Sequence, residues 1–132
     1  MDRPVSEHWI VNPPELGDPV GFAHAVAAAP GRTVWLGGQI GGGDNVVEQF
    51  DAAATNLLAA LSAAGGEPDH LVSLVVYTTV IDEYRASTRE IGEVWRRHFG
   101  RRYPAMALVC VSALFDPDAR VELMGVAVVP DG

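Results

Sequence analysis

Few side chains in this sequence can perform acid–base or nucleophilic chemistry, and their types exclude several mechanisms. All nine basic residues are arginine, so no lysine amine is available to form a Schiff base or to anchor pyridoxal phosphate. His24 lies in an apolar segment, where its imidazole either exchanges protons near neutral pH or forms a structural hydrogen bond. Cys110 is the single cysteine, and His24 is its one candidate activator. A lone cysteine in an apolar strand is more often a small, inert hydrophobe.

A second candidate base is Glu122, which shares strand parity with Met124. Its carboxylate either acts in a site or pairs with Arg120 or with a neighbouring subunit. The remaining histidines are too scattered among the acids to predict a metal site: His8, His70 and His98. We therefore expect neither a metal nor an organic cofactor.

Hydrophobic periodicity predicts six strands and two helices that position these groups. Strands are expected over 6–11, 23–29, 33–36, 71–80, 105–111 and 121–129, and helices over 45–64 and 82–99. The Pro30-Gly31 turn is expected to join the second and third strands into a hairpin. Asn45 with Glu48 fits a capping box for the first helix, and Asp82 can cap the second.

The order β-β-β-α-β-α-β-β over residues 1–132 predicts one α+β domain, with two helices on one face of a mixed sheet. The strands at 105–111 and 121–129 are apolar at both alternations. Such strands need cover on both faces, and two helices cover only one. Self-association through the open face is the simplest source of the second cover.

A formal net charge of −8 argues against a general nucleic-acid surface. One basic cluster is the exception: Arg96, Arg97, Arg101 and Arg102. It is either a solvated helix C-terminus, the favoured interpretation, or an anion or RNA contact. The glycine-rich segment 37–43 lacks the lysine of a phosphate loop and is expected to be a turn whose backbone approaches a neighbour. No apolar run is long enough to span a membrane and no secretory signal is evident, so a cytoplasmic protein is expected.

Six segments follow one another in a specific order and spacing along nearly the whole chain. They are GFAHAV at 21–26, VWLGGQIG at 34–41, AAGG at 63–66, LVSLVVYTT at 71–79, VWRRHF at 94–99 and the strand pair within 103–129. Together they resemble the RidA/YjgF family of reactive-intermediate (enamine/imine) deaminases. The resemblance implies a chorismate-mutase-like fold and a homotrimer with ligand clefts between subunits.

In these deaminases an arginine grips the substrate carboxylate, and a glutamate positions the water that hydrolyses an imine. In this sequence Met106 stands at the arginine position and Met124 at the glutamate position, while Gly37 replaces a serine and Gly92 lies near a frequent asparagine. Methionine suits a plastic apolar pocket. The resemblance therefore implies that both methionines line one interface cleft, rebuilt for a different ligand.

The same alignment implies which residues form this cleft. His24 and Glu122 are the candidate catalytic residues. The expected substrate-binding residues are Phe22, Gly37, Gln39, Trp95, Met106, Leu108, Cys110 and Met124. Trp35 is expected in the core, whereas Phe22 and Trp95 are expected at the cleft edge.

Three functions are compatible with the sequence. The leading hypothesis is a divergent enzyme acting on a reactive imine, enamine or related intermediate, with little activity toward 2-imino acids. It would bind a small, largely apolar or weakly anionic metabolite between subunits. The second is a non-catalytic binding or regulatory module. The third is an endoribonuclease, which the net charge of −8 opposes.

Overall fold

The computed structural model describes residues 8–131, so residues 6–7 of the first expected strand lie outside the described range. Its strands are β1 (Trp9–Val11), β2 (Ala25–Ala27), β3 (Gly31–Gln39), β4 (Leu71–Thr78), β5 (Ala105–Cys110) and β6 (Val121–Pro130). Its α-helices are α1 (Val46–Ala63), α2 (Ile81–Ala86) and α3 (Thr88–Phe99). Two short 3-10 helices cover Pro14–Leu16 and Pro68–His70.

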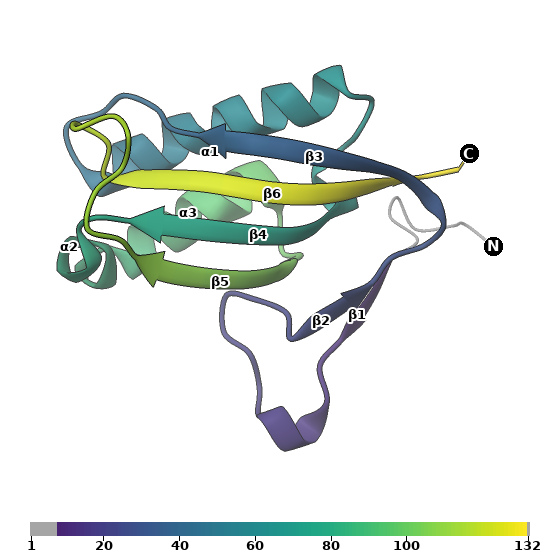
Figure 1. Cartoon of the computed structure of the whole chain (residues 1–132). Helices are drawn as coiled ribbons and strands as arrows, with labels where there is room; N and C mark the ends of the chain where they lie inside the picture. Colours follow the sequence, from purple (N-terminus) through teal and green to yellow (C-terminus); the bar gives the residue numbers. More distant parts are fainter. Residues whose placement is uncertain (1–7, 132) are drawn as a thin grey trace.

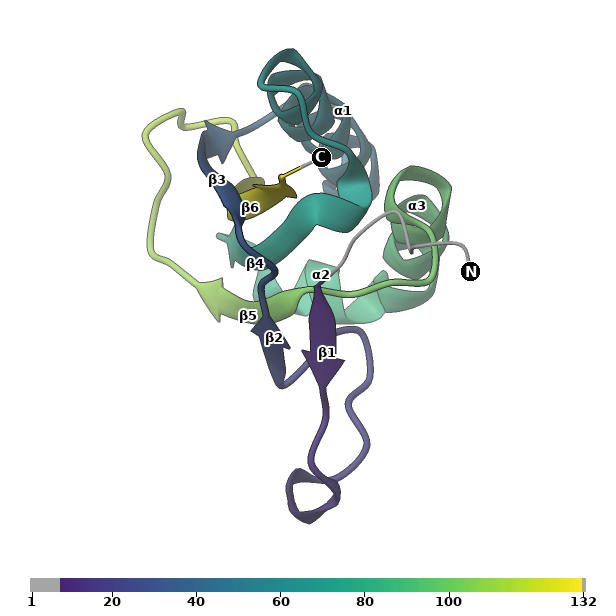
Figure 2. The ribbon, with the colours of Figure 1, turned by 90° about the vertical axis from the view of Figure 1, so that its right-hand side faces the viewer.

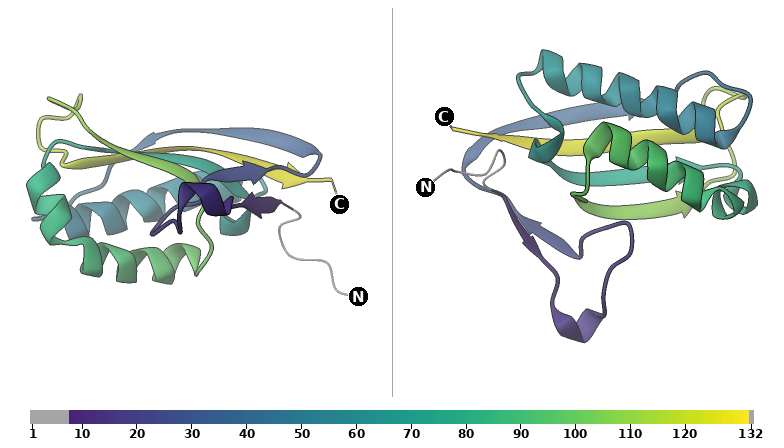
Figure 3. Two further views of the ribbon diagram at one scale, coloured as in Figure 1. Left: turned by 90° about the horizontal axis from the view of Figure 1, so that it is seen from below. Right: turned by 180° about the vertical axis from the view of Figure 1, so that it is seen from behind.

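The expected two-layer α+β architecture is confirmed. Four strands form a mixed sheet in the order β3-β6-β4-β5, in which only β4 and β5 run parallel. Helices α1 and α3 cover one face of this sheet, the helix face, and leave the other, the open face, without a helix (Figures 1 and 3). Among residues 8–131 no helix is long and apolar enough to cross a membrane.

Strand alternation separates the two faces of the sheet. On the helix face Leu74, Val76 and Leu123 are fully buried against α1 and α3. Their chain neighbours project to the open face, because successive side chains of a strand point to opposite sides. The domain core therefore lies between the sheet and the two longer helices (Figure 2).

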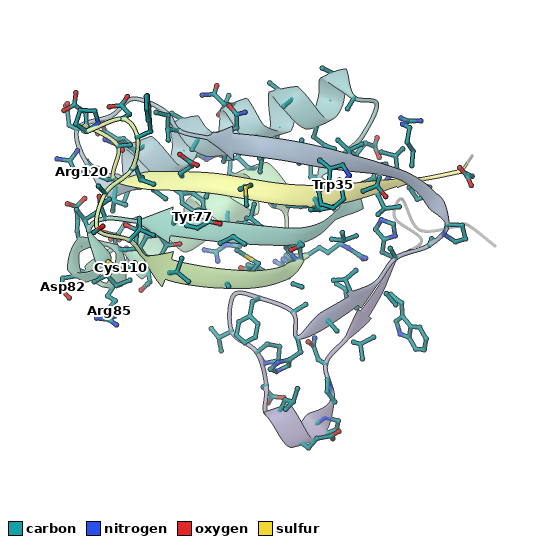
Figure 4. The ribbon with its side chains drawn as sticks, viewed as in Figure 1. Trp35, Tyr77, Asp82, Arg85, Cys110 and Arg120 are labelled. Atoms are coloured by element: carbon teal, nitrogen blue, oxygen red, sulfur yellow. The ribbon has the colours of Figure 1, made fainter. Side chains whose placement is uncertain are left out.

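The open face carries large side chains that the chain itself does not cover. Trp35 of β3 is 78% exposed and Met124 of β6 is 41% exposed. Trp35 and Tyr77 both lie on this face in Figure 4. The expectation that Trp35 packs in the core is wrong, because its cross-strand pairing with Val126 places it opposite the helices.

Helix α1 forms and ends as its sequence predicts. The Asn45 side chain accepts a hydrogen bond from the Glu48 amide at 2.9 Å, and the Glu48 carboxylate accepts one from the Asp44 amide at 3.0 Å. At the other end Gly65 has a φ of +89°, and the Gly66 amide donates to the carbonyl oxygen of Leu61 at 2.9 Å. These contacts satisfy backbone groups that the helix ends leave unpaired.

The glycine-rich segment is a close connection to α1 over residues 40–43, as expected, but residues 37–39 belong to β3 and not to a turn. A Cβ on Gly41 would overlap Ala52 of α1, and one on Gly43 would lie 2.6 Å from Cβ of Glu48. Only glycine therefore lets this backbone pass so close to the helix.

The expected hairpin between the second and third strands is wrong. β2 pairs antiparallel with β1, whereas β3 pairs with β6. A Cβ on Gly31 would overlap the Val129 carbonyl, so Gly31 serves a close approach to β6 rather than a hairpin turn. Residues 9–27 form a separate N-terminal arm, which extends beyond the β5 edge of the sheet (Figure 1).

The expected single helix over 82–99 is also wrong, since the chain breaks at Ser87 into α2 and α3. Ser87 has φ −112° and ψ 12°, and serine competes with helical backbone bonds through its own hydroxyl. The N-cap of α2 is Val80 rather than Asp82. The break lets Tyr84 approach Phe50 of α1, with ring centroids 6.4 Å apart.

Candidate functional site

A cavity of about 450 Å³ lies on the helix side of the sheet, at the β5 edge. Its walls come from the N-terminal arm, from α2 and α3, and from β5. Four of the expected substrate-binding residues line it: Phe22, Trp95, Met106 and Leu108. Most of the other lining side chains are apolar or aromatic, as is usual for small-molecule sites.

Stacked aromatic rings form the α3 side of this cavity. Trp95 is 3% exposed and stacks on Phe99, with centroids 4.0 Å apart, and on Tyr103, at 5.1 Å. Its indole nitrogen donates a hydrogen bond to the Arg102 carbonyl at 3.3 Å. Because this polar atom is satisfied and the ring is packed on both sides, Trp95 offers a rigid wall.

The arm brings Phe22 to the cavity through one backbone contact. The Ala23 amide donates to the Pro104 carbonyl at 2.9 Å, and Ala23 forms an isolated parallel bridge with Ala105 at the start of β5. Gly21, with a φ of +77°, turns the chain just before Phe22. The arm therefore closes one side of the cavity while pairing with the sheet at a single position.

Met106 occupies the sheet wall of the cavity. It pairs with Leu74 of β4, shares the helix face with that residue, and packs against the core. Leu108 lies two residues further on the same side. The thioether and isobutyl groups make this wall apolar and deformable.

Tyr84 and Arg96 are polar residues of the cavity that the sequence did not single out as a site. Burial raises the pKa of the Tyr84 phenol to about 12, so this hydroxyl stays protonated at neutral pH. Tyr84 fits the apolar spacing of the helix expected over 82–99, a signal that indicates packing rather than a binding site. The sequence offered no signal that separates Arg96 from the other arginines of the basic cluster.

Three arginines of that cluster are exposed, as the favoured interpretation expects: Arg96, Arg97 and Arg101. Arg97 lies 3.5 Å from the Asp51 carboxylate, and Arg102 donates to the His8 carbonyl at 2.9 Å. Arg96 lines the cavity instead.

His24 does not line the cavity. Its Nε2 donates to the Gly17 carbonyl at 3.1 Å, and its backbone amide donates to the Asn12 side chain at 2.8 Å. Its ring meets the pocket-lining Phe22 edge-on, at 5.1 Å between centroids. These contacts give His24 a clear structural role in the arm, and its catalytic role stays a prediction.

Glu122 and Met124 project from the open face, opposite the cavity. Glu122 pairs across strands with Tyr77, and a Cβ on Gly38 would overlap its carboxylate. The expected alternative partner of Glu122, Arg120, instead lies 3.7 Å from Glu83.

The remaining expected residues are also away from the cavity. Gly37 and Gln39 belong to β3, at the opposite edge of the sheet from β5. Cys110 shares the side of Met106 on β5, but it is exposed at the strand end rather than buried as an inert hydrophobe (Figure 4). Within one chain, the structure thus divides the predicted site between two faces.

The polar residues form no metal-binding arrangement in the part of the chain that the structure describes, where no group of three or more His, Cys, Asp or Glu side chains could hold an ion. His98 instead contacts Asp51 at 2.5 Å, linking α3 to α1. His70 forms a local capping interaction with the Glu67 amide at 3.0 Å.

The fold and the sequence both match known proteins. The family model described as endoribonuclease L-PSP matches residues 18–129. A 2-iminobutanoate/2-iminopropanoate deaminase from Capra hircus is 32% identical over 107 residues, which cover 74% of this chain and 73% of that protein. The chain belongs to the RidA/YjgF family.

Solved structures support this RidA/YjgF assignment. The Rid-family protein YyfB from Yersinia pestis superposes with a TM-score of 0.81 at 26% identity, covering 92% of this chain and 98% of that one. A member of the YjgF/YER057c/UK114 family from Mycobacterium tuberculosis gives a TM-score of 0.66 at 32% identity, covering 92% and 99%. The cavity beside Met106 is therefore set in a RidA/YjgF scaffold.

Proposed function

We propose that this protein is a divergent RidA-type enzyme that acts on a reactive imine, enamine or related intermediate. It binds a small, largely apolar metabolite at a subunit boundary, in a cytoplasmic homotrimer. The observation that carries the proposal is the apolar cavity walled by Met106, Trp95 and Phe22 within this scaffold. The deaminase similarity of the goat relative supports the reaction class.

The division of the predicted site between two faces supports assembly. Met106 faces the cavity, and Met124 with Glu122 faces away from it, on the open side of the sheet. These residues share one cleft only if the open face of a second subunit covers the cavity of the first. The exposed Trp35 and Met124 supply apolar surface for such a contact.

The proposed reaction is imine hydrolysis. The oxygen of a water molecule bonds to the imine carbon while a base, Glu122 of the covering subunit, accepts its proton. The base passes this proton to the imine nitrogen, which gives a carbinolamine. The carbinolamine loses ammonia as its hydroxyl proton moves to nitrogen and the C–N bond breaks. Imine and water thus yield a carbonyl compound and ammonia.

The test compares imines with and without a carboxylate on the imine carbon. An amine oxidase generates imines with apolar groups and no such carboxylate, an amino acid oxidase generates iminopyruvate, and the measured quantity is the rate of carbonyl formation beyond the spontaneous rate. We expect acceleration for imines with large apolar side chains and little for iminopyruvate, because no arginine stands at position 106. Strong activity on iminopyruvate that Met106→Ala leaves unchanged would refute the proposal that the cleft is rebuilt for a different ligand.

A second candidate, a non-catalytic binding module, is favoured by one observation. No carboxylate or histidine lines the cavity among the residues that the structure describes. A ligand that raises the thermal stability of the assembly without being consumed, together with no acceleration for any imine, would select this function. RNA cleavage remains the third alternative, and replacing the four clustered arginines tests whether they contribute.

A further inference from the structure

Arg96 gives the cavity a charge that the apolar walls do not suggest. It is the one charged side chain among the described residues that line the cavity, and no carboxylate accompanies it there. The protein as a whole carries a net charge of −8. A cavity whose one charge is positive therefore contrasts with the negative charge of the whole molecule.

The nearby carboxylates are engaged with other arginines. Glu93, one turn before Arg96 on α3, lies 3.8 Å from Arg89. Asp51 of α1 contacts Arg97. Within residues 8–131 no carboxylate lies within ion-pair distance of the Arg96 guanidinium.

Gly92 leaves room beside this guanidinium. It precedes Arg96 by one helical turn and also lines the cavity. A Cβ on Gly92 would lie 3.6 Å from Nη1 of Arg96, so a larger side chain would crowd the guanidinium. The absence of a side chain keeps the helix surface beside the charge open to a ligand.

We propose that Arg96 binds the anionic group of the ligand, so that the cavity selects an apolar monocarboxylate over its neutral analogue. The inference deepens the proposed function, because it requires the cavity to be the ligand site. Arginine presents paired N–H donors to a carboxylate, and the apolar part of the ligand packs against Trp95 and Met106. The anion-binding group thus comes from helix α3 and not from strand β5.

Two probes of similar shape, one anionic and one neutral, test how the charge of the ligand affects binding. Indole-3-acetate and indole-3-acetamide are titrated into the full-length protein by calorimetry. Because the guanidinium is solvent-exposed, we expect a modest preference for the acetate, about five- to tenfold in Kd. Arg96→Gln should remove this preference and leave acetamide binding unchanged.

Arg101→Gln is the matched control. Arg101 is exposed, belongs to the same basic cluster and does not line the cavity. Its replacement should leave the preference intact. Equal loss of preference in both variants would overturn the proposal in favour of a general effect of surface charge.

The results for the two probes distinguish a failure of the Arg96 proposal from a failure of the cavity as a ligand site. If acetamide and acetate bind the wild-type cavity equally, and Met106→Trp abolishes both, the cavity is a ligand site and the role of Arg96 is refuted. If Met106→Trp affects neither probe, or neither binds, both the cavity site and the inference fail. Circular dichroism of each variant checks that the fold is retained.

Discussion

Met106 and Met124 flank β4 one residue apart in register and project from opposite faces of the sheet. Met106 pairs with Leu74 on one side of β4, and Met124 pairs with Val75 on the other side. Since Leu74 and Val75 are consecutive, their side chains point to opposite faces, and so do those of their partners. A pocket that holds both methionines must therefore draw them from two subunits.

Cross-linking tests this subunit sharing. In a background with Cys110→Ser, the double variant Met106→Cys, Met124→Cys should form covalent dimers and trimers under oxidation, seen on a non-reducing gel. A disulfide requires Cα atoms within about 7 Å, so bonding shows close approach. Each single variant serves as a control and should stay monomeric on the gel, because neither position is expected to meet its own copy. Efficient dimer formation by one single variant would contradict the proposed pairing.

The open face should hold the assembly together through Trp35. We expect Trp35→Asp to shift the protein from oligomer to monomer in sedimentation velocity experiments, because it places a charge within the apolar contact. Trp9→Asp is the matched control, since Trp9 is 72% exposed but belongs to the arm. If Trp35→Asp leaves the sedimentation coefficient unchanged, the open face is not the interface.

Two glycines of β3 should differ sharply in their tolerance of a methyl group. Gly31→Ala should lower the free energy of unfolding by about 1–3 kcal/mol, since its Cβ would overlap the Val129 backbone and force the strands apart. Gly37→Ala should have an effect within about 0.5 kcal/mol, since no atom lies within 4 Å of its Cβ position. Urea unfolding measures both values, and equal costs would show that the contact at Gly31 relaxes easily.

Tyr84 should make the fold sensitive to alkaline pH. The pKa of Tyr84 in the folded protein is about 12, above the usual 10.0. The neutral phenol therefore contributes fully to the free energy of unfolding below pH 10, and this contribution is lost as the pH rises toward 12. Across that window wild type should lose up to about 2–3 kcal/mol more stability than Tyr84→Phe. Urea unfolding at pH 8 and pH 11 checks this difference, which should reach about 1.4 kcal/mol at pH 11. Equal losses of stability in the two proteins would show that the pKa of Tyr84 is the same in the folded and unfolded states.

Local patterns were enough to predict the main architecture. Helix α1 follows from its apolar spacing and from the caps at Asn45 and Gly65, all of which are interactions between residues close in sequence. The strands β4 and β6 follow from their dense apolar runs. The RidA/YjgF assignment rested on the order of several such segments, and the comparisons confirm it.

Contacts between distant segments limited the prediction of the site. The partner of β2 could not be read from Ala25–Ala27, because a short alanine-rich strand carries little pairing information, and its real partner precedes it by 14 residues or more. The faces of Met106 and Met124 depend on the registers of both strands against β4. Arg96 could be distinguished from its arginine neighbours only once the positions of Asp51 and Glu93 were known.

The division of the proposed site between the two faces of the sheet has a genetic consequence. In a cell that makes two altered versions of the protein, one defective at Met106 and the other at Met124, mixed trimers would contain some intact clefts. Two such alleles would therefore complement each other, whereas two alleles altered on the same face would not. A subunit altered at both positions would in turn impair a normal partner, since it would disable both clefts to which it contributes.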